Sequence, residues 1–147
     1  MRALTVHQPH AWAIVRGIKR IENRSRSTLY RGPLAIHAGL SRESLGDRDD
    51  WDDAVMVGLP DWRDLPFGAV VGVVDLIDCV AVEAAERLHP DQYEFASGPW
   101  CWVLANPRPL SRPLPCPGSL GLWRLPANVL AAVAAASGTR CEPAGPR

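Results

Sequence analysis

Lysine is almost absent from this chain, which holds one lysine, Lys19, against fifteen arginines in 147 residues. A lysine ammonium is a compact charge whose pKa falls readily on burial, whereas the charge of arginine is fixed. The single lysine therefore indicates that residue 19 needs a titratable amine, or a cation more compact than arginine. The alternative is that chance left one lysine in an arginine-rich chain.

Closely spaced cysteines are also missing. No two of the four are separated by only two residues, so a zinc finger or zinc ribbon is not predicted. These cysteines are Cys79, Cys101, Cys116 and Cys141. His7 and His10 offer two metal ligands, but no third ligand follows at a suitable spacing. We predict no metal and no cofactor.

Long apolar runs do not occur either. No stretch reaches the roughly 18 apolar residues of a membrane-spanning helix, and the first residues lack the apolar core of a signal peptide. These absences predict a cytoplasmic protein with reduced thiols and no membrane contact. The sequence also has no nucleophile-elbow serine motif, no phosphate-binding loop and no dinucleotide fingerprint.

Net charge is zero, so the chain as a whole exerts no pull toward nucleic acid. The charges are nevertheless uneven: residues 16–31 hold six basic side chains and one acid, and residues 43–64 hold eight acids and two arginines. A basic segment and an acidic segment can steer an anionic ligand to one face of the protein. Alternatively, their side chains form solvated ion pairs with each other. The sequence leaves both possibilities open.

Fourteen prolines and twelve glycines exclude a fold of long helices. Strands are predicted at residues 2–8, 19–25, 32–38, 68–82, 98–107 and 121–126. Helices are predicted at residues 10–17, 47–58 and 127–137, residues 81–96 are predicted to form a short helix and a loop, and a proline-rich stretch covers residues 107–121. The nearly unbroken apolar run at 68–82 is typical of a strand buried on both faces, and Gly72 within it indicates a bulge or a close backbone approach.

This pattern predicts a mixed α/β, β-rich fold, a small closed or partly open barrel with a few short helices. The length suits one domain. We place that domain at residues 1–137, because Gly138 ends the last predicted helix, and we expect residues 138–147 to be a disordered tail.

The stretch around the lysine has the pattern G-x-K-x-x-E-x-R, formed by Gly17, Lys19, Glu22 and Arg24. On a regular strand Arg20, Glu22 and Arg24 point to one face, and Lys19 points to the other unless the turn after Gly17 rotates it. One interpretation is an exposed ion pair between Glu22 and Arg24. The other is a cleft in which Lys19 and Arg24 bind an anion and Glu22 orients them. The spacing does not decide between them.

Other polar and aromatic side chains are weaker candidates. His7 and Gln8 lie at the end of the first predicted strand, where Gln8 offers a donor and an acceptor to a ligand or to the backbone. His37 is predicted to be a structural histidine. Trp100 and Trp102 share one strand face, where they either stack on a base or pack in the core.

The chain resembles the ASCH domain family over residues 3–126. The resemblance is carried, in this order, by LTVHQPHAWAIVRGIKRIENRS, YRGPLAIHAG, GAVVGVVDLIDCV, GPWCWVLANPRPL and GSLGLWRL. It implies a β-barrel of the PUA-like kind with a cleft beside it, in which the hallmark residues Lys19, Glu22 and Arg24 bind RNA, single-stranded nucleic acid, or a nucleoside or nucleotide. Arg20, Arg26 and Arg31 are expected to meet phosphates, and His7, Gln8 and Trp102 to approach the same cleft.

Two further functions remain open. Some relatives are amidohydrolases acting on a modified cytidine nucleoside and carry a nucleophilic threonine where this chain has Glu22, and others are ribonucleases. In a hydrolase, Lys19 would be an amine of lowered pKa and Glu22 the proton acceptor. In a protein-interaction domain, the acidic segment 43–64 would be the contact surface.

Overall fold

The computed structural model describes residues 1–45 and 57–140, which form one six-stranded sheet with short helices around it. The strands are β1 (Arg2–Val6), β2 (Ile21–Arg24), β3 (Gly32–Ala38), β4 (Ala69–Ala81), β5 (Trp100–Pro115) and β6 (Leu122–Arg124). The α-helices are α1 (His10–Val15), α3 (Val82–Leu88) and α4 (Ala127–Ser137), and the 3₁₀ helices are η1 (Glu43–Leu45), η3 (Trp62–Asp64) and η4 (Pro90–Phe95). None of the described helices is both long and apolar enough to cross a membrane.

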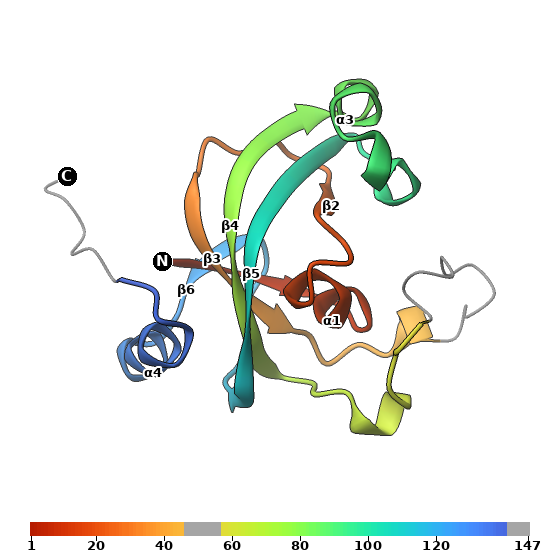
Figure 1. Cartoon of the computed structure of the whole chain (residues 1–147). Helices are drawn as coiled ribbons and strands as arrows, with labels where there is room; N and C mark the ends of the chain where they lie inside the picture. The colour runs from red at the N-terminus through yellow and green to blue at the C-terminus, as the bar shows by residue number, and fades with distance from the viewer. Residues whose placement is uncertain (46–56, 141–147) are drawn as a thin grey trace, which may run out of the picture.

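The strand order is β2-β5-β4-β3-β1-β6, with β1 parallel to β3 and the other pairs antiparallel. The sheet curls into a half-barrel (Figure 1), and β2 and β6 are its two edge strands. This architecture confirms the predicted β-rich fold with a few short helices. The helix predicted at residues 47–58 falls largely outside the described residues.

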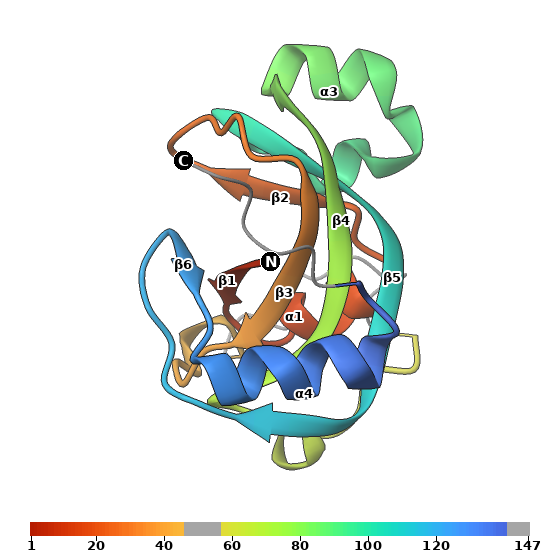
Figure 2. The ribbon, with the colours of Figure 1, turned by 90° about the vertical axis from the view of Figure 1, so that its left-hand side faces the viewer.

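Two helices cover opposite faces of the sheet. Helix α1 packs against the inner face of the curl and α4 lies across the outer face (Figure 2). Side chains along the strands alternate between the two faces. Leu4 and Ile36 pack in the hydrophobic cluster under α1, whereas Ala3, Ala35 and Val73 pack in the cluster under α4. Because helices cover both faces, β4 has the continuous apolar run that the sequence shows.

Gly72 lies where α1 approaches β4 most closely. A Cβ added there would be 2.6 Å from Cγ1 of Val15 and 3.0 Å from the carbonyl oxygen of Arg108. The pairing of β4 with β5 also shifts register between Val70 and Gly72. Both features predicted for this glycine, the bulge and the close approach, are therefore present.

The proline-rich stretch corrects the sequence-based strand boundaries. Strand β5 does not end near residue 107 but continues to Pro115. It pairs with β2 only over residues 100–103, so among the described residues its second half has a partner on one side alone. Proline lacks an N–H group and is tolerated on such an edge. The prolines of residues 107–115 therefore belong to an edge segment of the sheet rather than to a loop.

Gly72→Ala is expected to lower the free energy of unfolding by about 1–3 kcal/mol, because the added methyl group overpacks the contact between α1 and β4. Chemical denaturation monitored by tryptophan fluorescence measures the change. In a Val15→Ala background the same substitution should cost less, since the clashing side chain has been shortened. If Gly72→Ala lowers the free energy of unfolding equally in both backgrounds, the contact with Val15 is not the reason that residue 72 is a glycine.

Candidate ligand-binding site

The turn after α1 decides where the single lysine points. Gly17 adopts a left-handed backbone with φ of 75°, and the N–H groups of Ile18 and Lys19 both donate to the carbonyl oxygen of Ala13, at 3.0 and 3.2 Å. Lys19 thus belongs to the helix-terminating turn and precedes β2, which begins at Ile21. The alternation of strand side chains does not govern it, and the turn brings it to the side of Glu22.

Lys19, Glu22 and Arg24 converge in the structure. The Nζ atom of Lys19 lies 3.7 Å from Oε1 of Glu22, and Nη2 of Arg24 donates to Oε2 of Glu22 at 3.2 Å. Lys19 is 4% exposed and Glu22 is 7% exposed. The exposed ion pair is therefore the wrong interpretation of the motif, because this pair is buried.

His10 is the nearest neighbour of the lysine. Its Nδ1 atom lies 2.9 Å from Nζ of Lys19. Burial, and secondly the positive charge of Lys19, lower the pKa of His10 from 6.5 to about 4. The imidazole is consequently neutral at pH 7, and its Nδ1 accepts a hydrogen bond from the lysine. Sequence reasoning considered His10 only as a metal ligand and missed this contact.

Burial also lowers the pKa of Lys19, and the adjacent carboxylate of Glu22 opposes the shift. The direction follows from the cost of holding an ammonium away from water. The lysine amine is thus easier to deprotonate than an exposed one.

Arg24 links the two sides of the curled sheet. Its Nη2 atom donates to the carbonyl oxygen of Thr5 on β1 at 2.9 Å, although three strands separate β2 from β1 in the sheet order. The buried Nε atom of Arg24 has no hydrogen-bond partner among the described residues. Arg24 therefore closes the open side of the half-barrel while retaining an unused donor.

These side chains line a pocket of about 400 Å³ between the end of β1, the start of α1 and strand β2. Besides the four residues already described, His7, Ser44 and Ser97 contribute side chains to its wall. His7 is exposed, as a residue at a pocket mouth would be. The pocket brings together four of the residues predicted from sequence, namely His7, Lys19, Glu22 and Arg24.

Gln8 and Trp102 have structural roles instead. Gln8 is fully buried, where its Oε1 accepts from the N–H of Trp12 and its Nε2 donates to the carbonyl oxygen of Pro66, both at 2.9 Å. Trp102 is 4% exposed, and its Nε1 donates to the carbonyl oxygen of Arg26 at 3.0 Å. Neither side chain lines the pocket, so Trp102 offers no stacking surface there.

The remaining predicted arginines also lie outside the pocket. Arg20 precedes β2 and forms an ion pair with Asp91, which corrects the expectation that it shares a face with Glu22 and Arg24. Arg31 lies 3.6 Å from Asp78, and Arg26 is exposed in the loop after β2. Basic residues near each other in sequence thus do not form one basic cleft.

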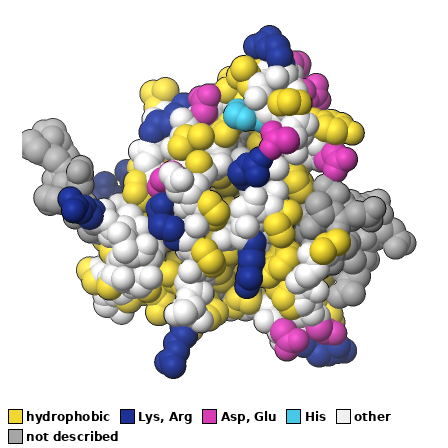
Figure 3. Space-filling view, in the orientation of Figure 1, with side chains coloured by type: hydrophobic (Ala, Val, Ile, Leu, Met, Phe, Trp, Pro, Cys, Tyr) yellow, Lys and Arg dark blue, Asp and Glu magenta, His cyan; other side chains and the backbone are white. Residues whose placement is uncertain are grey.

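Surface charge is mixed on the face drawn in Figure 3, where several basic side chains lie beside acidic ones. Within the described part of the acidic segment 43–64, Arg63 lies 3.3 Å from Asp61, so some of its charge is paired internally. Residues 46–56 of that segment lie outside the described residues. This face therefore carries no uniform charge that would steer an anionic ligand toward it.

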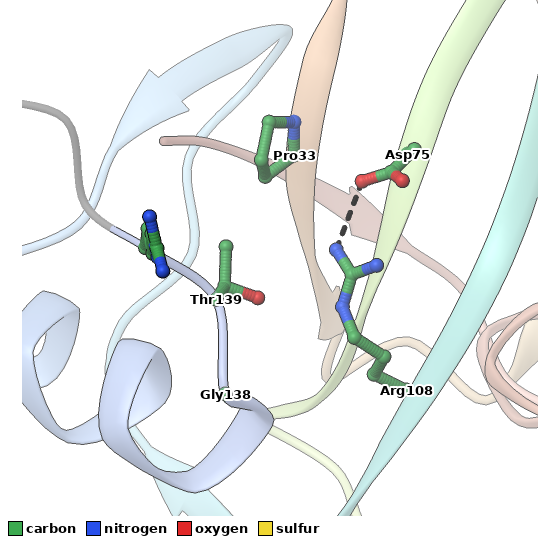
Figure 4. Close-up of a pocket in the computed structure, with 6 residues that line it drawn as sticks. Pro33, Asp75, Arg108, Gly138 and Thr139 are labelled. Carbon is green, nitrogen blue, oxygen red and sulfur yellow. Dashed lines mark hydrogen bonds and ion pairs between the residues drawn. The ribbon is translucent and has the colours of Figure 1, made fainter.

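A second hollow of about 410 Å³ lies beside the C-terminal end of α4 (Figure 4). Asp75 and Arg108 face each other there at 2.9 Å, and Asn106 donates to the same carboxylate at 2.8 Å. The hydrogen bond from Arg108 holds the pKa of Asp75 below its usual value. Arg140 also lines this hollow, so its charges balance to one positive charge, as in the first pocket; the difference is that Asp75 and Arg108 are partly exposed, whereas Lys19 and Glu22 are buried.

Comparisons with known proteins agree on one family. The family model of the ASCH domain matches residues 4–114. Activating signal cointegrator 1 of Homo sapiens is 33% identical over 132 residues, and that of Mus musculus is 32% identical over 132 residues. The alignments cover 86% of this chain but 22% of each relative, so the chain spans about a fifth of their length.

Solved structures share the fold. The crystal structure of ASCH from Zymomonas mobilis has a TM-score of 0.59 and 17% sequence identity, over 91% of this chain and 93% of that chain. A mutant of the same protein has a TM-score of 0.57 and 16% identity, over 91% and 96%. At this identity the likeness establishes the architecture alone.

The low pKa of His10 predicts a specific acid sensitivity. Because the folded pKa, about 4, lies below the unfolded value of 6.5, the unfolded state binds more protons between these pH values. The contribution of His10 to the free energy of unfolding is therefore greatest above pH 6.5. It falls by about 3 kcal/mol as the pH is lowered to 4. Denaturant unfolding measured from pH 7 to pH 4 reports this loss.

His10→Asn is the matched variant, since its amide oxygen can accept from Lys19 without titrating. The variant should lose less stability than the wild type over the same pH range. Identical pH dependence in both proteins would contradict the assignment of a lowered pKa to His10.

Proposed function

This chain belongs to the ASCH domain family, and on that premise we propose that it binds one nucleotide unit, free or within RNA or single-stranded nucleic acid, in the pocket of Lys19, Glu22 and Arg24. The observation that carries this proposal is that two cations, the buried Lys19 and the partly buried Arg24, line one cavity of about 400 Å³ with a single carboxylate, Glu22, between them. We further propose that residues 1–137 act as a single binding domain.

The charge of the pocket favours an anion. Lys19 and Arg24 contribute two positive charges, Glu22 contributes one negative charge, and His10 is neutral at pH 7. The balance of one positive charge suits a phosphate group, and charge-assisted hydrogen bonds are about twice as strong as neutral ones. Arg24 is the best phosphate donor of the set, because its planar guanidinium carries several N–H groups, lines the pocket and is 28% exposed.

The base of such a nucleotide would meet imidazole and hydroxyl groups. Trp102 lies in the core, so His7 at the pocket mouth is the ring proposed for stacking. Ser44 and Ser97 supply hydroxyl groups that can donate or accept. Asn23 has little to offer, since its amide already bonds the backbone at Phe95, Ser97 and Gly98.

Hydrolysis through Glu22 is the weaker proposal. Its Oε1 accepts from the N–H of Asn23 at 3.1 Å, and its Oε2 accepts from Arg24 at 3.2 Å. These contacts stabilise the carboxylate as a fixed counter-ion rather than as an exchanging base. The protein-interaction alternative depends on a segment that lies mostly outside the described residues.

Arg24→Ala is expected to weaken binding of a short single-stranded oligoribonucleotide about tenfold or more, because it removes a charge-assisted contact. If one phosphate contact is lost, the slope of log affinity against log salt should fall by about 0.7. Fluorescence anisotropy over a salt series measures both quantities.

Arg63→Ala is the matched control, since Arg63 is exposed on η3 and is paired only with Asp61 among the described residues. It removes one positive charge without touching the pocket and should bind RNA like the wild type. Arg24→Lys should keep the salt slope but recover only part of the affinity. Equal losses in Arg24→Ala and Arg63→Ala would mean that general charge, and not the pocket, binds RNA.

A further inference from the structure

The single lysine of the chain lines the pocket, and its position suits covalent as well as ionic chemistry. We propose that Lys19 forms a reversible imine with the aldehyde of a phosphate-bearing ligand, specifically the ring-opened sugar of an abasic nucleotide. The identity of this ligand class rests on the proposed nucleotide binding. The reactivity of the amine rests on the contacts around Nζ.

Two acceptors surround the amine. They are Nδ1 of His10 at 2.9 Å and Oε1 of Glu22 at 3.7 Å, contributed by α1 and β2. A neutral amine has two hydrogens and one lone pair. If the hydrogens point toward these two acceptors, the lone pair takes the remaining direction, on the side where Lys19 lines the cavity. The arrangement orients a nucleophile.

The local environment also makes the neutral amine easier to form than on an exposed lysine, although the resting side chain is charged. Burial lowers the pKa of Lys19, and the charge of Arg24 acts in the same direction, while Glu22 opposes both. Lysine nucleophiles are activated in this way, by desolvation and by a neighbouring cation. Arginine cannot replace lysine in this chemistry, which accounts for one lysine persisting among fifteen arginines.

The step balances without an oxidant or a reductant. The lysine ammonium first loses its extra proton to solvent in the pocket, and Nζ then attacks the aldehyde carbon to form a carbon–nitrogen bond. The carbonyl oxygen collects both remaining amine hydrogens and leaves as water, producing the imine. Hydrolysis reverses the reaction.

Arg24 selects for a phosphate next to the aldehyde. Its guanidinium lines the pocket, is 28% exposed, and contacts the same carboxylate as Lys19. An abasic nucleotide carries an aldehyde within a few bonds of a phosphate. A nucleotide without a base forgoes the contacts to His7 and the serines, but its phosphate and sugar keep those to Arg24 and Lys19 in the pocket of about 400 Å³.

The test uses the whole chain, a single-stranded oligodeoxynucleotide with one abasic site, and sodium cyanoborohydride, which reduces an imine to a stable amine. We expect a covalent complex whose mass spectrum places the adduct on Lys19. The same oligonucleotide with a tetrahydrofuran analogue, which has no aldehyde, should bind but give no complex. Lys19→Arg should reduce trapping at least tenfold.

Because the chain has one lysine, the competing amine is the α-amino group of Met1. Adducts confined to Met1, or no adduct while the tetrahydrofuran oligonucleotide binds, would overturn the imine and leave the proposed function intact. Failure of the tetrahydrofuran oligonucleotide to bind would instead overturn the proposed function. The wild-type comparisons remain decisive even if Lys19→Arg does not fold.

Discussion

A buried ion pair between Lys19 and Glu22 is the constraint on which the rest of the site depends. Withdrawing two charges from water costs several kcal/mol per ion, so the pair persists only where further hydrogen bonds support it. His10 and Arg24 provide that support, one at each end of the pair. The four side chains form one connected network of hydrogen bonds and ion pairs.

The curl of the sheet makes this unit accessible to a ligand. Strand β2 lies at one edge of the half-barrel, and the bond from Arg24 to Thr5 brings it against the end of β1. Helix α1 begins at that same end, which places His10 beside the lysine that follows the helix. The pocket is therefore a product of the fold, since its walls come from segments that meet only when the sheet has curled.

Much of this could be predicted from the sequence, because local rules govern it. Alternation and turn signals located β3 at residues 32–38 and α4 at residues 127–137, where the structure has them. The direction of Lys19 could not be predicted, since the hydrogen bonds to Ala13 override strand alternation. Arg20 and Trp102 were misplaced because their partners, Asp91 and the carbonyl oxygen of Arg26, depend on tertiary packing.

The most direct test of nucleotide binding in this pocket is a titration of isotopically labelled protein with a short single-stranded oligoribonucleotide, followed by amide NMR shifts. The account predicts saturable shifts that cluster at Lys19, Glu22, Arg24 and Ser97, around the pocket of the buried ion pair. Shifts that cluster instead at Asp75, Arg108 and Thr139, or no shifts at low salt, would contradict it.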